Sequence, residues 1–214
     1  MKTALIAGAS GLVGQSLLLQ LLHSDQYSKI IALVRRPSLG NHPKLKEEVI
    51  NFEDLGSYES PHNVDDVFCC LGTTIKTAGS QEAFRKVDFT YVIELAKWAE
   101  NKHCQQFAAI SSVGASTNTS NFYLRTKGEM EAAISTLNIP AIHIFRPSLL
   151  LGQRDEFRFG EKVSEIMMRL FNPMMKGRLR KYKAIEASDV AMAMYNKTQH
   201  SIDGVIIYEG AEIG

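Results

Sequence analysis

The sequence predicts a doubly wound α/β fold, in which helices cover both faces of a parallel sheet of about seven strands. Two patterns predict it. Short apolar runs without polar alternation, typical of strands buried on both faces, recur along the chain. Segments with apolar residues at helical spacing separate these runs, so strands and helices alternate. The 214 residues, 45% of them hydrophobic, are expected to form one domain over 1–214.

The first 36 residues carry the strongest pattern. An apolar run at 4–7 leads into a glycine-rich turn, and four leucines between positions 17 and 22 then fall on one helical face. A second apolar run at 30–34 follows at the distance of a βαβ unit, which takes about 30 residues. We therefore expect a strand, a turn, a helix and a parallel strand in this order.

The glycines of this turn, spaced Gly8-x-x-Gly11-x-x-Gly14, have separate expected tasks. Gly8 turns the chain, Gly11 lets backbone N–H groups approach a diphosphate, and Gly14 lets the helix pack closely on the strand. The phosphates then lie at the positive end of the helix. An ordinary tight turn is the alternative, but the flanking strand and helix favour a nucleotide site. The predicted cofactor contacts are Gly8, Ser10, Gly11, Leu12, Val13 and Gly14.

The end of the second strand indicates which dinucleotide binds. An NAD site places a carboxylate there for the ribose 2′-hydroxyl, whereas an NADP site needs room and positive charge for a 2′-phosphate. This chain has Arg35 and Arg36 at that point and no carboxylate. Because a guanidinium binds phosphate through two hydrogen bonds, the sequence favours NADP(H) over NAD(H). A pair of solvated arginines is the alternative.

The next segments continue the alternation. Residues 37–47 are predicted as a loop, 48–52 as the third strand and 66–71 as the fourth. Ligands of open α/β sheets bind beyond the carboxyl ends of the strands. Leu71 and Gly72 are therefore expected to lie against the cofactor.

The second half of the chain supplies the remaining layers. A helix is predicted over 81–102, and its apolar stripe is interpreted as core, with no chemical role for Asp88. The stripe comprises Phe84, Val87, Tyr91, Leu95 and Trp98. The other predicted elements are a strand at 107–110, a helix over 123–137, a strand at 142–145, a partly helical insert at 152–183, a helix capped by Ser188 or Asp189, and a strand at 204–208.

Tyr123 and Lys127 lie four residues apart, and therefore on one face of the predicted helix. A free phenol, with a pKa of about 10, is a poor acid–base group at neutral pH, but a neighbouring ammonium and an oxidised nicotinamide stabilise the phenolate. Tyr123 can then protonate a carbonyl oxygen as hydride arrives, or deprotonate an alcohol in reverse. Lys127 is also expected to hydrogen-bond the nicotinamide ribose. An exposed tyrosine beside a solvated lysine is the alternative.

Two serines follow the predicted fifth strand. Ser111 and Ser112 lie 12 and 11 residues before Tyr123. One of the hydroxyls is expected to donate a hydrogen bond to the substrate oxygen, as the donors of an oxyanion hole do. Ser111 is the favoured one of the two.

Six segments together resemble a known family: GASGLVG, the arginine pair, CCLGTT, AISSVGA, YLRTK and IFRPSLLLGQR. They are similar to the atypical short-chain dehydrogenase/reductases, in particular the group typified by the Tat-interacting-protein oxidoreductases. The resemblance runs from residue 3 to about 160. It implies a Rossmann-like fold, NADP binding and a catalytic tyrosine–lysine pair. The spacing between the two serines and Tyr123 is also close to the serine–tyrosine spacing of that superfamily. The resemblance also implies cofactor contacts at Asp54, Leu55, Arg146, Leu149 and Arg154. An ordinary polar turn after the third strand is the alternative for Asp54 and Leu55, and a solvated side chain is the alternative for Arg154.

The expected substrate region is small. Extended members of that superfamily that act on nucleotide sugars carry a larger C-terminal substrate domain, whereas this chain has room only for a lid around 150–185. A methionine-rich stretch at 167–175 is either core or a lid or homodimer contact. A basic segment at 176–183 is interpreted as a solvated loop, with binding of an anionic group as the alternative.

Composition excludes several other classes. A net charge of +1 gives no general attraction to nucleic acid or to a membrane surface, and no run is long enough to span a membrane. Cys69, Cys70 and Cys104 are interpreted as buried thiols in a reducing compartment. The six histidines show no metal-ligand spacing, so we expect no metal site and a cytoplasmic protein.

The sequence thus predicts an NADP(H)-dependent oxidoreductase that acts on a small carbonyl or alcohol substrate. The alternative, from another class, is a non-catalytic NADP(H)-binding sensor that regulates a protein partner.

Overall fold

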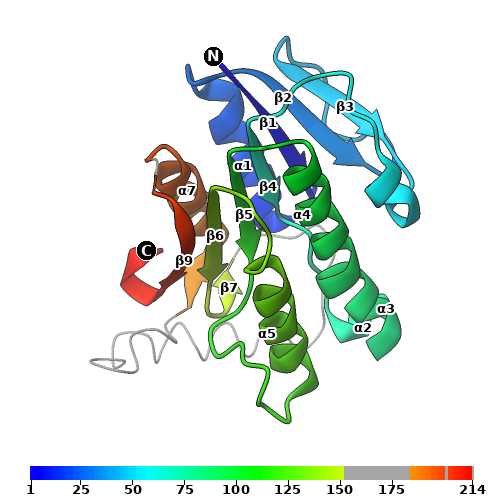
Figure 1. The fold of residues 1–214 in the computed structure, drawn as a ribbon, viewed down its shortest axis with the longest axis vertical. Coiled ribbons are helices and arrows are strands. Elements are labelled where there is room, and N and C mark those ends of the chain that lie inside the picture. The colour runs from blue at the N-terminus through cyan, green and yellow to red at the C-terminus, as the bar shows by residue number, and fades with distance from the viewer. Residues whose placement is uncertain (152–183, 201, 214) are drawn as a thin grey trace.

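The computed structural model describes residues 1–151, 184–200 and 202–213. Its centre is a seven-stranded parallel sheet with the strand order β3-β2-β1-β4-β5-β6-β9 (Figure 1). The doubly wound fold predicted from the sequence is confirmed. The strands are β1 (Lys2–Ala7), β2 (Tyr27–Val34), β3 (Leu45–Val49), β4 (Asp66–Cys69), β5 (Gln106–Ile110), β6 (Ala141–Arg146) and β9 (Gly204–Glu209).

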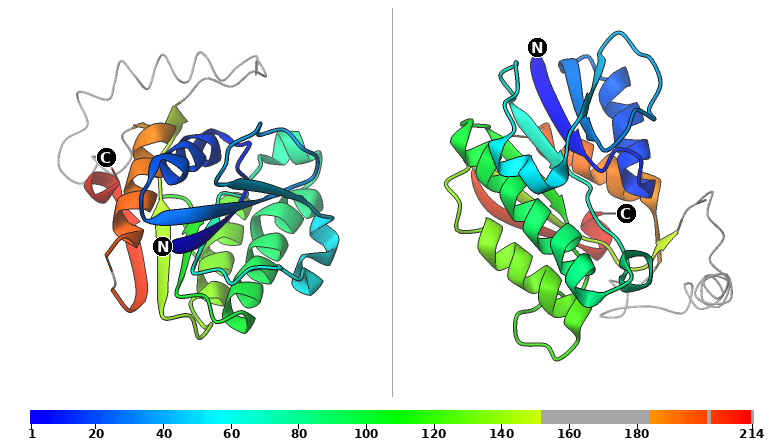
Figure 2. Two further views of the ribbon diagram at one scale, coloured as in Figure 1. Left: turned by 90° about the horizontal axis from the view of Figure 1, so that it is seen from above. Right: turned by 90° about the vertical axis from the view of Figure 1, so that its right-hand side faces the viewer.

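Helices cover both faces of this sheet (Figure 2). On one face, α1 (Leu12–His23) packs beside α7 (Ala187–Thr198). On the other face lie α4 (Tyr91–Asn101) and α5 (Phe122–Ile134), with the short α2 (Ile75–Ala78) and α3 (Gln81–Arg85) at their end (Figure 1). The sheet is therefore a buried middle layer.

Strand β1 shows why the apolar runs do not alternate with polar residues. Ala4 and Ile6 belong to the core under α1 and α7, whereas Leu5 and Ala7 belong to the core under α4 and α5. Successive side chains of a strand point to opposite faces, so a strand covered on both sides must be apolar at every position.

The third strand differs from its prediction. It begins at Leu45, inside the predicted loop, and ends at Val49, while Phe52 already belongs to the 3-10 helix η1 (Phe52–Ser57). Strand β3 is an edge strand with the sequence LKEEV, and none of its residues is fully buried. Edge strands commonly carry charge, which removes the apolar signal used to place the interior strands.

The predicted helix over 81–102 is divided. A π-helical turn, η2 (Lys86–Thr90), separates α3 from α4. Leu95 and Trp98 of the predicted stripe are buried in α4, together with Val92, Ala96 and Ala99. Val87 and Tyr91 of the stripe, which lie in and directly after the π turn, are only partly buried.

The structure describes only the ends of the predicted lid region. These form a small second sheet, in which β7 (Leu150–Leu151) pairs with β8 (Ile185–Glu186). The insert at 152–183, with the methionine-rich and basic segments, lies outside the described residues. Helix α7 begins at Ala187 with Glu186 at the N-cap position, so the prediction of Ser188 or Asp189 as the cap is wrong.

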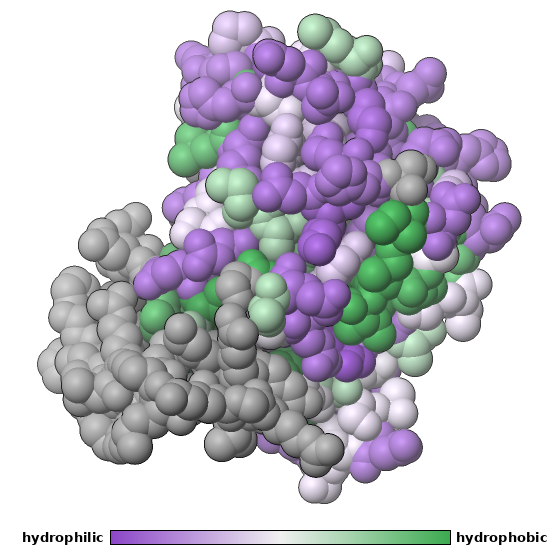
Figure 3. All heavy atoms as spheres, turned by 90° about the vertical axis from the view of Figure 1, so that its left-hand side faces the viewer, coloured by the Kyte–Doolittle hydropathy of each residue, from purple (hydrophilic) through white to green (hydrophobic). Residues whose placement is uncertain are grey.

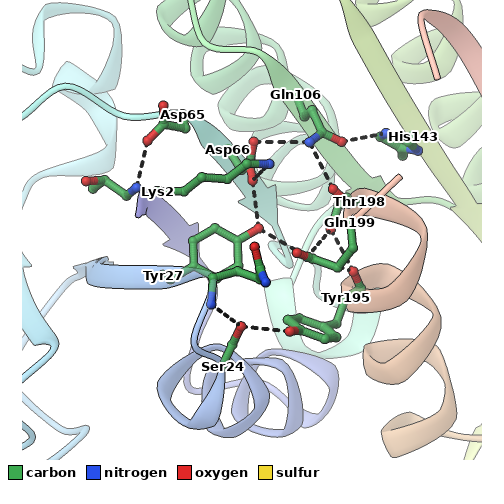
Figure 4. Close-up of polar contacts among 12 residues, drawn as sticks. Lys2, Ser24, Tyr27, Asp65, Asp66, Gln106, His143, Tyr195, Thr198 and Gln199 are labelled. Atoms are coloured by element: carbon green, nitrogen blue, oxygen red, sulfur yellow. Dashed lines mark hydrogen bonds and ion pairs between the residues drawn. The ribbon is translucent and has the colours of Figure 1, made fainter. Parts of the chain in front are cut away.

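A buried polar network joins the amino ends of several strands (Figure 4). Asp66, at the start of β4, has no exposed surface and accepts hydrogen bonds from Tyr27 (2.7 Å), Lys2 (3.0 Å) and Gln106 (3.2 Å). The side-chain oxygen of Gln106 lies 3.0 Å from Nε2 of His143, which is also fully buried. Burial lowers the pKa of His143 to about 4, so this histidine is neutral at pH 7.

The surface on the side of β9 is mostly polar but is interrupted by apolar residues (Figure 3). Ile202, Val205 and Ile207, in and before this edge strand, are each about half exposed. In the described ranges no helix is long and apolar enough to cross a membrane.

Candidate active site

The glycine turn between β1 and α1 leaves no room for side chains at two of its positions. Gly8 has a φ of +84°, and a Cβ atom there would lie 2.5 Å from the carbonyl oxygen of Cys70. A Cβ on Gly14 would lie 2.1 Å from the carbonyl oxygen of Gly8. The turn therefore packs directly against the end of β4, and α1 packs directly against the turn.

The amino end of α1 is open to an anion. Gly11 is its N-cap residue, and in the described chain this helix end has neither a side-chain cap nor an acidic residue in its first turn. Gly11 is exposed, and Ser10 beside it is exposed too. Backbone N–H groups at such an end have no partner within the helix and carry partial positive charge. Leu12 and Val13 can therefore contact a phosphate through their backbones, with their side chains turned to the core.

The residues predicted around the adenosine end lie beyond β2 and β3. Arg35 and Arg36 are exposed, and neither forms a hydrogen bond or ion pair with another described residue. Asp54 is exposed and accepts a hydrogen bond from Asn51 at 2.9 Å. Leu55 is 1% exposed and packs in the core, so only its backbone can reach a ligand.

Beyond β4, the chain is held by a buried carboxylate. Leu71 is partly buried and Gly72 is exposed, and the backbone N–H of Thr73 donates to Oδ2 of Asp88 at 2.8 Å. Asp88 is 1% exposed and lies in the π turn η2. The sequence prediction assigned Asp88 no chemical role, whereas the structure places its carboxylate beside Lys127 of the predicted site.

Lys127 is buried and paired with that carboxylate. Its Nζ atom lies 2.8 Å from Oδ1 of Asp88 and donates to the carbonyl oxygen of Ile110 at 3.1 Å. Burial, the largest influence, lowers the pKa of Lys127, but Asp88 and then Tyr123 outweigh it, so the pKa is raised. The amine therefore remains an ammonium at neutral pH, with the phenol of Tyr123 close enough to act on it.

Tyr123 lies in the first turn of α5 and is partly buried. The side chain of Asn121 caps this helix by accepting from the N–H of Leu124, and the ring of Tyr123 packs against Phe84 with centroids 5.6 Å apart. A Cβ on Gly128 would lie 2.4 Å from the backbone of Ser116, so the loop after β5 lies directly on α5. The helix that carries the tyrosine is thus fixed against the strand end that carries the serines.

The two serines have different surroundings. Ser111 is 3% exposed, and its hydroxyl donates to Oε1 of Glu131. Ser112 is partly buried, and its hydroxyl has only a long contact of 3.4 Å with the carbonyl oxygen of Val113. The sequence favoured Ser111, whereas these contacts favour Ser112, because the hydroxyl of Ser111 is already engaged.

Arg146 also has partners that its prediction as a cofactor contact did not foresee. Its guanidinium donates through Nε to Glu131 at 2.8 Å and through a terminal nitrogen to Glu209 at 2.7 Å. The hydrogen bonds that Arg146 donates to Glu131 and Glu209 raise its pKa further, although burial acts in the opposite direction. These bonds hold β6 against α5 and β9, and the contact of Arg146 with a cofactor stays a prediction. Leu149 is 38% exposed, and Arg154 lies outside the described residues.

Sequence reasoning missed Asp88 and Glu131. Glu131 had a usable signal, since Tyr123, Lys127 and Glu131 recur every four residues and share one helix face. Asp88 had none, because the π turn that places it is not visible in the sequence.

Other parts of the described chain offer less. A hollow of about 440 Å³ between α7 and the C-terminal turn η5 (Gly210–Glu212) is lined by residues such as Asp189, Lys197 and Glu212, and holds no predicted site residue. No group of three or more His, Cys, Asp or Glu side chains able to hold a metal occurs in the described ranges. Cys69 and Cys104 are buried and Cys70 is partly buried, all as free thiols.

These features define a class of protein. A glycine turn before an open helix end, with a tyrosine–lysine pair on the helix that connects β5 to β6, is the arrangement of an NAD(P)-dependent oxidoreductase. The chain belongs to the NAD dependent epimerase/dehydratase family, which it matches over residues 4–195.

Similar proteins agree with this family. HTATIP2 from Rattus norvegicus is 38% identical over 164 residues, which cover 75% of this chain and 67% of that protein. The mitochondrial protein FMP52 from Eremothecium gossypii is 33% identical over 218 residues, covering 98% and 95%. The resemblance to the Tat-interacting-protein group is thereby confirmed.

Solved structures share the fold. WbmH from Bordetella bronchiseptica, in complex with NAD+, superposes with a TM-score of 0.71 at 15% identity, over 98% of this chain and 75% of its own. The oxidoreductase ylbE from Lactococcus lactis gives a TM-score of 0.67 at 20% identity, over 97% and 91%.

The expected cytoplasmic location is contradicted. The FMP52 proteins of Eremothecium gossypii, Debaryomyces hansenii and Meyerozyma guilliermondii are all named mitochondrial, and each is similar to this chain. The net charge, the reduced thiols and the lack of a long apolar run, on which the expectation depended, do not report on organelle targeting.

Proposed function

We propose that the protein transfers hydride between NADP(H) and a small carbonyl or alcohol, with Tyr123 as the acid–base group. One observation carries the proposal most directly: Lys127 is a buried ammonium on the same helix face as Tyr123, and the two groups interact electrostatically. A persistent positive charge beside a phenol stabilises the phenolate that proton transfer requires.

The glycine turn supports dinucleotide binding. Side chains at Gly8 and Gly14 would collide with backbone, while the exposed Gly11 leaves the open end of α1 accessible. The residues present therefore fit a diphosphate. When bound, the nicotinamide supplies or accepts the hydride.

The chain's own residues would carry out the proton transfer and the positioning. Tyr123 gives its phenolic proton to the carbonyl oxygen in reduction and recovers it in oxidation. Ser112 donates a hydrogen bond to the same oxygen and stabilises its developing negative charge. Lys127 keeps its charge through its ion pair with Asp88 and lies one turn from Tyr123 on the same helix face.

NADP(H) is the proposed cofactor because two arginines follow the carboxyl end of β2. Arg35 and Arg36 are exposed and have no anionic partner among the described side chains, so both guanidinium groups are available to a 2′-phosphate.

The test uses Tyr123→Phe with Tyr195→Phe as the matched control, since Tyr195 lies on α7 and bonds Ser24 instead. We expect Tyr123→Phe to bind NADPH normally, followed by the fluorescence of NADPH, and to lose at least about 100-fold in turnover of a panel of aldehydes and ketones. Tyr195→Phe should retain turnover. NADPH binding without any turnover by the unmodified protein would instead favour the sensor alternative.

A further inference from the structure

A series of hydrogen bonds runs across the carboxyl ends of three neighbouring strands, β5, β6 and β9, and passes through Glu131 of α5. The Ser111 hydroxyl donates to one oxygen of Glu131, and Arg146 donates to both oxygens of the same carboxylate. Arg146 continues to Glu209 at the end of β9, at 2.7 Å. Ser111 and Glu131 are 3% and 5% exposed, so these bonds are shielded from water.

Helix α5 therefore holds two successive residues at the end of β5. Lys127 donates a hydrogen bond to the carbonyl oxygen of Ile110 at 3.1 Å. Glu131, one turn later on the same helix face, accepts a hydrogen bond from the hydroxyl of Ser111. Tyr123 lies one turn earlier on that face.

Backbone bonds fix both neighbours of Ser112. The N–H of Ser111 donates to Phe145 at 2.7 Å, and the N–H of Val113 donates to Pro147 at 2.9 Å. The residue between them is thus held from both sides, while its own hydroxyl makes only the long contact to Val113.

We propose that Glu131 and Arg146 are positioning residues, which bind the Ser111 side chain and thereby fix the end of β5 so that Ser112 presents its hydroxyl to the substrate oxygen. This inference depends on the proposed function for its catalytic meaning. It assigns the two serines different tasks, one structural and one at the reacting oxygen.

A carboxylate at position 131 matches its partners because all three donors point at it and it has only acceptors. An amide of the same size would turn an N–H group toward the guanidinium or the hydroxyl. Glu131→Gln therefore breaks this series of hydrogen bonds while keeping the volume of the side chain.

The first test is independent of substrate. In a Cys70→Ala background, Ser111→Cys and Ser112→Cys are prepared and labelled with a maleimide in the folded protein. We expect Ser112→Cys to react at least about tenfold faster than Ser111→Cys, because a thiol buried beside a carboxylate is both inaccessible and protonated. Equal rates would overturn the proposal.

The second test adds Glu131→Gln to the Ser111→Cys protein. Labelling of the cysteine at position 111 should then accelerate several-fold. Glu129→Gln, which neutralises a carboxylate on the same helix that is 32% exposed, should have no effect. Unchanged labelling after Glu131→Gln would contradict the inference. If Glu131→Gln does not fold, Arg146→Lys is used in its place, because a lysine cannot form the bidentate contact with Glu131.

Turnover then connects the geometry to function. Glu131→Gln should lower kcat about tenfold and leave the KM for NADPH within about twofold, while a merely structural role would change the melting temperature and leave the kcat of the folded fraction intact. If the unmodified protein turns over no carbonyl, the proposed function fails, and the labelling rates still decide which serine is presented.

Discussion

The Nζ atom of Lys127 and Oδ1 of Asp88 lie 2.8 Å apart in a site where both side chains are almost fully buried. The carboxylate comes from the π turn η2 and the ammonium from α5, so the pair joins the helices on one face of the sheet. Because Asp88 also accepts from Thr73, the same carboxylate reaches the end of β4. The pair thus both anchors the fold and keeps the lysine charged.

Asp88→Asn should destabilise the protein by roughly 3 kcal/mol, because it leaves the buried ammonium of Lys127 without an anionic partner. Urea unfolding measures the loss. The matched control is Glu94→Gln, which breaks an exposed pair with Lys97 and should cost less than about 1 kcal/mol. Equal effects of the two substitutions would show that burial does not strengthen the Asp88–Lys127 pair.

Replacing Arg35 and Arg36 together with alanine should weaken NADPH binding at least about tenfold and change NADH binding by no more than about threefold. Only NADPH carries the 2′-phosphate that the two guanidinium groups would bind. Fluorescence titration with both cofactors gives the ratio. The charge-matched control replaces Lys97 and Lys102 together with alanine, since both are exposed lysines, paired with Glu94 and Glu59. A parallel loss for both cofactors would remove the assignment to NADP(H).

Gly14→Ala and Gly11→Ala should separate packing from cofactor binding. At Gly14 the new methyl group would meet backbone at 2.1 Å, which should cost about 3 kcal/mol of unfolding free energy. At Gly11 the nearest atom would be 3.3 Å away, so stability should fall by less than about 1 kcal/mol while NADPH binding weakens at least about tenfold. Thermal unfolding and cofactor titration of both variants distinguish the two effects; a reversed order would contradict the assigned tasks.

His143 should make stability depend on pH. Its pKa in the folded protein is about 4, because burial disfavours the charged form, whereas an unfolded histidine titrates near 6.5. The unfolded state therefore binds the proton first, so this contribution is complete above pH 6.5 and decreases toward pH 4, by about 2 kcal/mol between pH 7 and pH 5. Urea unfolding at both pH values should show a smaller decrease for His143→Gln, and the same decrease would exclude the histidine as the cause.

The interior of the fold could be predicted from the sequence because its physical demands are local. Strands buried on both faces must be apolar at each position, and the close contact of Gly14 with Gly8 admits only glycine. The bounds of β3 were not predicted correctly, because an edge strand does not need an uninterrupted run of apolar residues.

The candidate site could be predicted only in part. The four-residue spacing placed Tyr123 and Lys127 together, but the partners of Arg146 come from α5 and β9, 15 and 63 positions away. Which serine is engaged likewise depends on Glu131, on another element. Such contacts are set by tertiary packing, which no short pattern records.

The polar network around Asp66 (Figure 4) lies at the amino ends of the strands, whereas the glycine turn follows the carboxyl end of β1. The two ends of the parallel strands are therefore separate targets for protein engineering. We expect a change of cofactor preference to need substitutions only on the side of Arg35 and Gly11, so that the network around Asp66 can be left unchanged.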